Sequence, residues 1–354
     1  MNIKMLALAI SGALSSVTVV WAGNTITGVS TGNLNTITAE QAGDDNSLAI
    51  TQVSDSNIST VSQTGTSNKA TIFQGGLSGL NTASIIQNGL RNSATINEEG
   101  SNSIATINQI GNDNIAIIHQ TASHVQAGIQ QIGNSNYVEI QQLDNTEPQV
   151  TQSGSGNTIF INNIGYFPNY QNIVQASDTN VATIDQATGI NNAVNVVQSG
   201  ATDNTTITQK GSFNSSTIDQ GGVVTNNALV SQIGQSNTST INQNIADTNG
   251  DNSAAVAQAG NGNAASIDQT NGNTNIAIVT QSGTSDNTVL AQTGSYNTSL
   301  ITQGGSGLDT VSANQTGVEN IATINQNITD TNATINNALV VQNGDANAVS
   351  ITQQ

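Results

Sequence analysis

Apolar and polar residues alternate along most of the chain, in short stretches that each end on a glutamine. In the stretch "NKATIFQ" at residues 68–74, Asn68, Ala70, Ile72 and Gln74 occupy every second position. A period of two residues is the pattern of a β-strand with one buried face. A short glycine-containing link follows, and glycine permits the backbone conformations that a reversal of direction requires. The pattern predicts strands of about seven residues joined by four-residue turns.

These stretches form a tandem repeat with the consensus Asn-x-Ala/Ser-x-Ile-x-Gln-x-Gly-x-x. Glutamine or a substitute ends each of 28 units, and 18 of the 27 intervals are 11 residues. Ile, Val or Leu lies two residues before this final glutamine or its substitute in 26 units, and Asn lies six residues before it in 22 units. An 11-residue period also fits a right-handed helical coiled coil. The alternation within each unit, the Thr, Ile, Val and Asn content and the recurrent glycine exclude that interpretation.

We therefore expect an all-β fold, a β-solenoid of about 14 coils with two strands and about 22 residues each, stacked in a cross-β, amyloid-like manner. Asn and Gln then face inward above their counterparts in the next coil, where their amides can hydrogen-bond in ladders. Stacked carboxylates would repel, so Glu98 is expected to be a weak point. The expected structural ladder and core residues include Asn57, Gln63, Asn68, Ile72, Gln74, Asn114, Gln120, Asn263, Gln269, Asn320, Gln326, Asn347, Ile351 and Gln353.

The first 22 residues have the features of a secretory signal peptide. They contain a lone Lys4, an apolar run from Met5 to Val20, and the small residues Val20 and Ala22 before the predicted cleavage point. No other segment approaches the roughly 18 to 20 apolar residues of a membrane helix. The chain is therefore expected to be secreted, without insertion into a membrane.

Residues 23–40 are interpreted as a degenerate first repeat that leads into the array, and residues 41–354 as the array itself. Within it, a block of about 83 residues is duplicated, over 187–269 and 270–353. The block holds seven units, an odd number. The long loops after Gln243 and Gln326 are therefore expected on opposite edges of the solenoid.

Composition narrows the classes of function. The formal net charge is −18, and the expected mature chain has three basic residues, Lys69, Arg91 and Lys210. Nucleic acids and anionic membranes are therefore poor partners, because their binding depends on neutralising phosphates. There is no cysteine, so the fold has no disulfide framework.

Few residues suggest site chemistry. His119 and His124 lack a clustered third ligand for a metal, and two histidines offer no catalytic constellation, so we expect neither a metal or other cofactor nor an enzyme. The outward threonines do not form the regular Thr-x-Thr array of an ice-binding surface. The aspartates are interpreted mainly as turn residues and as charges against aggregation, rather than calcium ligands: Asp44, Asp45, Asp113, Asp247, Asp251, Asp286 and Asp330.

The repeats resemble the curlin repeat family, whose members are subunits of bacterial curli fibres. The pattern Gln-x-Gly-x-x-Asn-x-Ala-x-x-x-Gln occurs between Gln63 and Gln74, and again over 109–120, 258–269 and 315–326. The resemblance extends over nearly the whole mature chain. It implies a homopolymeric extracellular amyloid subunit that is secreted unfolded through an outer-membrane pore, assembles on a nucleator, and contributes to biofilm matrix and adhesion.

Two functional hypotheses remain from the sequence. The first is a structural fibre subunit, in which the final stretch "NAVSITQQ" at residues 347–354 is an open strand that pairs with another molecule. Asn347, Val349, Ile351 and Gln353 would then be its inward residues. The alternative is a monomeric β-helical surface adhesin or stalk.

Overall fold

The structure is a computed structural model of the 354-residue chain. It describes residues 8–10, 14–19, 23–76, 78–143, 146–164, 168–222, 225–245, 251–305, 307–327 and 336–353.

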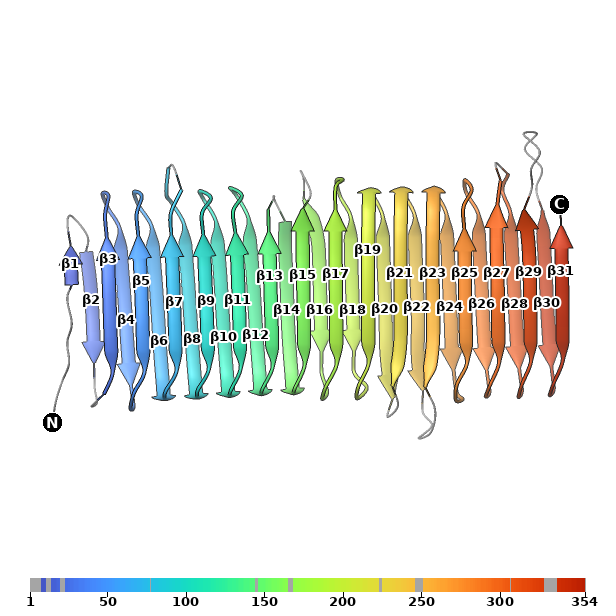
Figure 1. The fold of residues 1–354 in the computed structure, drawn as a ribbon, viewed down its shortest axis with the longest axis horizontal. Helices are drawn as coiled ribbons and strands as arrows, with labels where there is room; N and C mark the ends of the chain where they lie inside the picture. Colours follow the sequence, from blue (N-terminus) through green and yellow to red (C-terminus); the bar gives the residue numbers. More distant parts are fainter. Residues whose placement is uncertain are drawn as a thin grey trace. The chain divides into compact units, whose positions relative to one another are not determined.

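The chain divides into two compact units, residues 1–172 and residues 173–354. In both units successive strands alternate between two parallel sheets, which we call the odd and the even sheet after the strand numbers (Figure 1). The described residues contain no helix, and therefore none that could cross a membrane. The expected all-β solenoid is confirmed, with about 13 turns where about 14 coils were expected.

In unit 1 the odd sheet consists of β1 (Leu8–Ile10), β3 (Thr25–Ser30), β5 (Ser47–Gln52), β7 (Lys69–Gln74), β9 (Ser93–Glu98), β11 (Ile115–Gln120), β13 (Tyr137–Gln142) and β15 (Thr158–Ile164). The even sheet consists of β2 (Leu14–Val19), β4 (Thr36–Ala42), β6 (Ile58–Thr66), β8 (Thr82–Leu90), β10 (Ile104–Asn112), β12 (Gln126–Asn134) and β14 (Thr146–Ser155). The boundary between the units falls within β16 (Asn169–Gln175).

In unit 2 the odd sheet consists of β17 (Val181–Ala187), β19 (Asn204–Ser212), β21 (Asn226–Gln235), β23 (Asn252–Asn261), β25 (Ile276–Gln281), β27 (Thr298–Gly304), β29 (Ile321–Asn327) and β31 (Ala348–Gln353). The even sheet consists of β18 (Ala193–Gln198), β20 (Ser215–Gly222), β22 (Thr238–Ile245), β24 (Ala264–Thr270), β26 (Asn287–Thr293), β28 (Thr310–Thr316) and β30 (Asn337–Asn343).

The 28 predicted repeat units correspond one to one with strands β4 to β31. Within the first 22 residues, β1 pairs with β3 and β2 pairs with β4. The assignment of these residues to a signal peptide stays a prediction.

The core follows from pairing in register. Ile72, Ile96, Ile118 and Ile140 occupy the same position in β7, β9, β11 and β13, and each pairs with the next. All four are at most 1% exposed. Because side chains alternate across a strand, each residue between two inward positions points away from the core. Burial of one such isoleucine contributes about 1.5–3 kcal/mol.

The turns stack as closely as the strands. Gly89 has a φ of +132°, and a Cβ atom there would clash with the carbonyl oxygen of Gly111 in the next turn. Gly111 is placed in the same way against Gly133. Glycine recurs in the repeat because a side chain at this position would separate successive turns.

The two long insertions arise at opposite edges of unit 2. The first interrupts the even-to-odd connection between β22 and β23, and the second the odd-to-even connection between β29 and β30. Odd and even strands run in opposite directions, so these connections begin at opposite strand ends (Figure 1). The flanking strands agree with the expectation of opposite edges, while loop residues 246–250 and 328–335 lie outside the described residues.

Replacing Ile118 by alanine is expected to lower the free energy of unfolding by about 2–5 kcal/mol, because it opens a cavity between stacked strands. Ile115→Ala in the same strand is the matched control, since Ile115 is 39% exposed and its loss is expected to cost about 0.5 kcal/mol. Urea unfolding followed by circular dichroism measures both changes. Equal losses in the two variants would contradict the inward assignment of Ile118.

Candidate functional site

A continuous ladder of glutamine side chains runs along the even sheet of unit 1. Each Nε2 group donates to the Oε1 atom of the glutamine in the next turn, over 2.7–2.9 Å. The ladder joins Gln41, Gln63, Gln87, Gln109, Gln131 and Gln152, all at most 1% exposed. Glutamine serves here because a single amide both accepts from one neighbour and donates to the next.

The same amide groups also connect the two sheets. Gln63 Nε2 donates to the backbone oxygen of Ser47, and Gln109 Nε2 to that of Ser93, over 3.2 and 3.1 Å. Both acceptors belong to odd strands. Each interior glutamine therefore holds its own turn to the next turn and to the opposite sheet.

Asparagine side chains form a second type of ladder at the strand beginnings. Asn68 donates from its backbone nitrogen to Asn46 Oδ1 and from Nδ2 to the carbonyl oxygen of Gly89, over 3.0 and 2.9 Å. Asn114 repeats this arrangement with Asn92 and Gly133. In the even sheet, Asn57 Oδ1 accepts from the backbone nitrogen of Asn81. Asparagine thus satisfies backbone groups that the turns would otherwise leave buried without partners.

The odd ladder of unit 1 is interrupted at Glu98. Gln52 donates to Gln74 and Gln74 donates to Glu98 Oε2, over 3.0 and 2.8 Å. The ladder resumes with Gln120, which donates to Gln142. Between the two parts, Glu98 Oε1 and Gln120 Oε1 are both buried without a hydrogen-bond partner. Burial raises the pKa of Glu98 to about 8, against the opposing effect of the hydrogen bond from Gln74.

Unit 2 contains equivalent ladders. Gln243 donates to Gln269, which donates to Gln292, each over 2.8 Å. Asn263 Nδ2 donates to the carbonyl oxygen of Gly283, and Asn320 Nδ2 donates to Asn297 Oδ1. The expected ladder residues from Asn57 to Gln326 lie in buried, hydrogen-bonded rows, and Ile72 lies in the adjoining core.

Three aspartates replace asparagine in the ladders of unit 2, and the sequence reasoning missed this. Asp203, Asp286 and Asp309 are fully buried. Asp286 Oδ2 accepts from the backbone nitrogen of Gly283, so Asp286 is a turn residue as expected, but its burial contradicts the interpretation as a surface charge against aggregation. Burial raises the pKa of Asp203 to about 6; burial and the nearby Asp309 carboxylate raise the pKa of Asp286 to about 6. The repeat contained a signal for this burial. Each aspartate lies six residues before the glutamine that ends its unit, which is the position where most units have asparagine.

The last odd strand, β31, pairs with β29. Gln326 Nε2 donates to Gln353 Oε1 over 2.6 Å, and Asn347 Nδ2 donates to Asn320 Oδ1 over 2.8 Å. Val349, Ile351 and Gln353 occupy inward positions but are only half-buried. A further strand on this edge would cover them.

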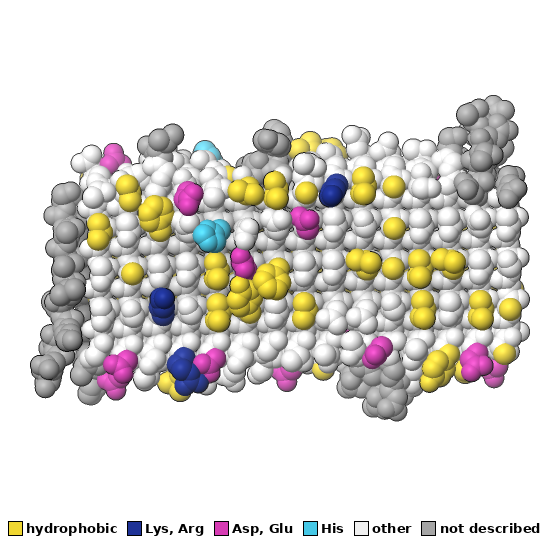
Figure 2. Space-filling view, in the orientation of Figure 1, with side chains coloured by type: hydrophobic (Ala, Val, Ile, Leu, Met, Phe, Trp, Pro, Cys, Tyr) yellow, Lys and Arg dark blue, Asp and Glu magenta, His cyan; other side chains and the backbone are white. Residues whose placement is uncertain are grey.

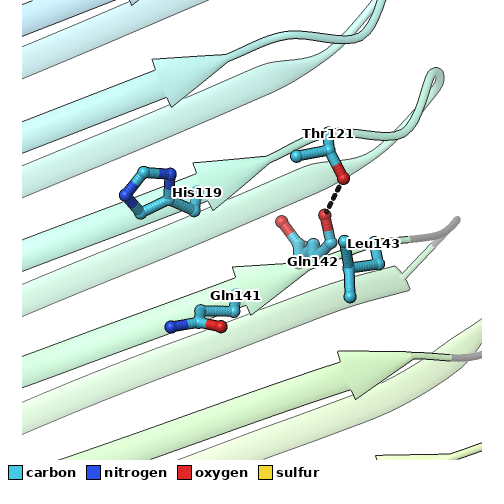
Figure 3. Close-up of a pocket in the computed structure, with 5 residues that line it drawn as sticks. All are labelled: His119, Thr121, Gln141, Gln142 and Leu143. Atoms are coloured by element: carbon cyan, nitrogen blue, oxygen red, sulfur yellow. Dashed lines mark hydrogen bonds between the residues drawn. The ribbon is translucent and has the colours of Figure 1, made fainter.

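The outer surface provides little that could bind a small molecule. Figure 2 shows a face composed mainly of uncharged polar side chains. His119, Thr121, Gln141, Gln142 and Leu143 line an open depression of about 230 Å³ (Figure 3). His119 Nδ1 lies 3.2 Å from Asn97 Nδ2. In the described part of the chain, no three His, Cys, Asp or Glu side chains form a group that could hold a metal ion.

Comparison with known families supports the resemblance seen in the repeats. The family model of the curlin associated repeat matches residues 43–76, 81–111 and 251–283. These segments correspond to the strand groups β5 to β7, β8 to β10 and β23 to β25. No curated protein matches the chain significantly. The resemblance to curlin repeats is thereby confirmed in three parts of the array.

Replacing Gln109 by leucine is expected to lower the free energy of unfolding by about 1–3 kcal/mol, because Gln87 Nε2 and Gln131 Oε1 lose their buried partner. Gln130→Leu makes the same change on an outward, exposed position of β12 and is expected to have little effect. Hydrogen exchange of the β8 and β12 amides measures the local loss. Similar protection in both variants would show that the ladder adds no stability.

Proposed function

We propose that this curlin-repeat solenoid is a structural subunit of an extracellular, curli-like amyloid fibre, which self-assembles by end-to-end stacking of its coils. Curlin repeats and the parallel two-sheet solenoid fit a curli-like structural subunit. The family is structural rather than enzymatic, which supports a role in assembly instead of catalysis.

The observation that carries the proposal is the direction of the glutamine ladders. Ladder amides donate from Nε2 toward the following turn, as from Gln315 to Gln342 and from Gln326 to Gln353. In the structure, Gln342 and Gln353 donate in turn to the backbone oxygens of Ile321, Asn347 and Asn337. In the even sheet of unit 1, Gln41 Oε1 is buried without a partner, and β2, which pairs with the strand of Gln41, lies within the predicted signal peptide. An acceptor of this kind in one copy is complementary to the ladder amide of Gln342 in another, which favours head-to-tail stacking of the even sheet.

The half-buried residues of β31 support the same proposal. An edge strand exposes unpaired backbone groups that can pair with another chain. Stacking a further coil on β31 would bury Val349 and Ile351 and add parallel backbone hydrogen bonds. Because each coil gains its stability from its neighbours, we expect the terminal coils of a chain to gain stability when they join an existing end.

The resemblance to curli subunits extends the proposal to partners and location. The primary partner is another copy of the same chain, with a nucleator subunit and an outer-membrane secretion pore as further partners. The proposed fibre lies at the cell surface and contributes to biofilm matrix and adhesion. The monomeric adhesin or stalk is the alternative that the following experiment separates.

Purified chain without its first 22 residues is expected to form unbranched fibrils within about a day at micromolar concentration. Electron microscopy shows their form, and fibre diffraction is expected to give a reflection near 4.7 Å from stacked strands. A well-folded protein that stays monomeric throughout would favour the adhesin and overturn the fibre proposal.

Replacing Ile351 by lysine is expected to slow seeded growth at the β31 edge at least about tenfold, because stacking would bury an unpaired charge. Ser350→Lys adds the same charge to the outward face of β31 and is expected to leave growth nearly unchanged. Thioflavin fluorescence after addition of preformed seeds measures both rates. Equal rates would count against stacking on this edge.

A further inference from the structure

Glu98 is the carboxyl group of the odd ladder in unit 1. Its backbone pairs with Gln74 on one side and Gln120 on the other, in register. Glu98 Oε2 accepts from Gln74 Nε2, as a glutamine oxygen would. Glu98 Oε1 therefore takes the place of the Nε2 donor, and this oxygen and Gln120 Oε1 both lack a partner.

Two acceptors on adjacent rungs require a hydrogen between them. A protonated carboxyl group provides one O–H donor and keeps an acceptor, so it reproduces the two functions of the amide that a ladder uses. An ionised carboxylate can only accept, and its burial without compensation is unfavourable. We propose that Glu98 takes up a proton when the chain folds and that the protonated side chain completes the ladder by donating to Gln120, which makes folding sensitive to pH.

The surroundings of Glu98 leave the proton as the available compensation. The stacked strands present the amides of Gln74 and Gln120. In an earlier turn, Gln52 Nε2 donates to the backbone oxygen of Asn57 and to Ser59 Oγ, which lie five and seven residues further along the chain. The residues at the same distances from Glu98 are Ser103 and Ala105. No charged side chain contributes to its raised pKa, which arises from burial. The neighbouring Glu99 is exposed and accepts a hydrogen bond from Asn97.

The direction of the pH effect follows from the difference between the two states. The pKa of Glu98 rises from 4.5 to about 8, so the folded state binds more protons between these values. Stability is then fully present below about pH 4.5 and falls as the pH rises through about 8. One proton taken up corresponds to a change of about tenfold in the folding equilibrium constant per pH unit within this window.

The buried aspartates of unit 2 add their own pH dependence, so the test must isolate Glu98. Asp203 and Asp286 have pKa values of about 6, and they remain in every variant compared. Their contributions cancel in the ratio of the folding equilibrium constants of wild type and Glu98→Gln. Glu98→Gln also restores the common ladder residue and is therefore expected to fold.

The experiment measures urea unfolding and the exchange of β9 and β11 amides for the chain without its first 22 residues, kept dispersed, from about pH 5 to pH 9. The ratio of the Glu98→Gln folding constant to that of wild type is expected to grow about tenfold per pH unit up to about pH 8, and more than about 100-fold in all. Glu99→Gln removes the same charge from an exposed position and is expected to give a constant ratio.

A second readout detects the proton itself. At neutral pH, the infrared spectrum of the folded wild type is expected to contain a C=O band of a protonated carboxyl group that Glu98→Gln removes and Glu99→Gln retains. A pH-independent ratio for Glu98→Gln, or an unchanged carboxyl band, would overturn the proposal. Because the chain is kept dispersed, the result does not depend on fibre formation, which is tested separately by microscopy.

Discussion

Parallel stacking in register is the constraint on which the rest of this structure depends. Each residue lies over the residue at the same position of the next turn, as Ile96 lies over Ile118 and Gln109 over Gln131. A position can therefore hold only side chains that tolerate a copy of themselves at the distance between paired strands, about 4.8 Å. Aliphatic groups meet this condition by packing, and amides meet it by donating in one direction and accepting from the other.

The same constraint relates the interior to the proposed function. A ladder can be extended by a further turn, because each amide accepts on one side and donates on the other. Gln353 accepts from Gln326 in this way, and Gln41 Oε1 in the even sheet of unit 1 is an acceptor without a donor. Interactions that stabilise the turns of one chain are therefore of the kind that would join two chains.

Carboxyl groups are the exception to this pattern of self-compatible ladder side chains. Glu98 leaves two unpartnered oxygens beside each other, whereas the neutral rungs around it are joined without a gap. Asp203 in unit 2 receives more donors, since Asn226 donates to its Oδ1 atom from both its backbone and its side chain, although Asp203 Oδ2 is buried without a partner. The free-energy cost of burying a carboxyl group in a ladder thus depends on whether a neighbouring residue supplies the missing hydrogen-bond donor.

The repeat pattern was sufficient to predict the strands, their inward residues and the weak point at Glu98. It could do so because alternation along a strand and an 11-residue period are local properties. The pattern identified Asp286 as a turn residue, which its bond from Gly283 supports, but it did not reveal that Asp286 occupies a buried ladder position. The burial of Asp286 depends on the turns above and below it, which the local sequence does not contain.

Periodicity and the hydrogen-bonding capacity of each side chain were enough to establish which residues face inward and that the amides stack. The direction of the ladders, the bonds from Gln63 and Gln109 to the opposite sheet, and the unpartnered oxygens of Glu98 and Gln120 became apparent in the folded chain alone. These features depend on the relative placement of strands 16 or more residues apart, and that placement is established when the turns close and stack.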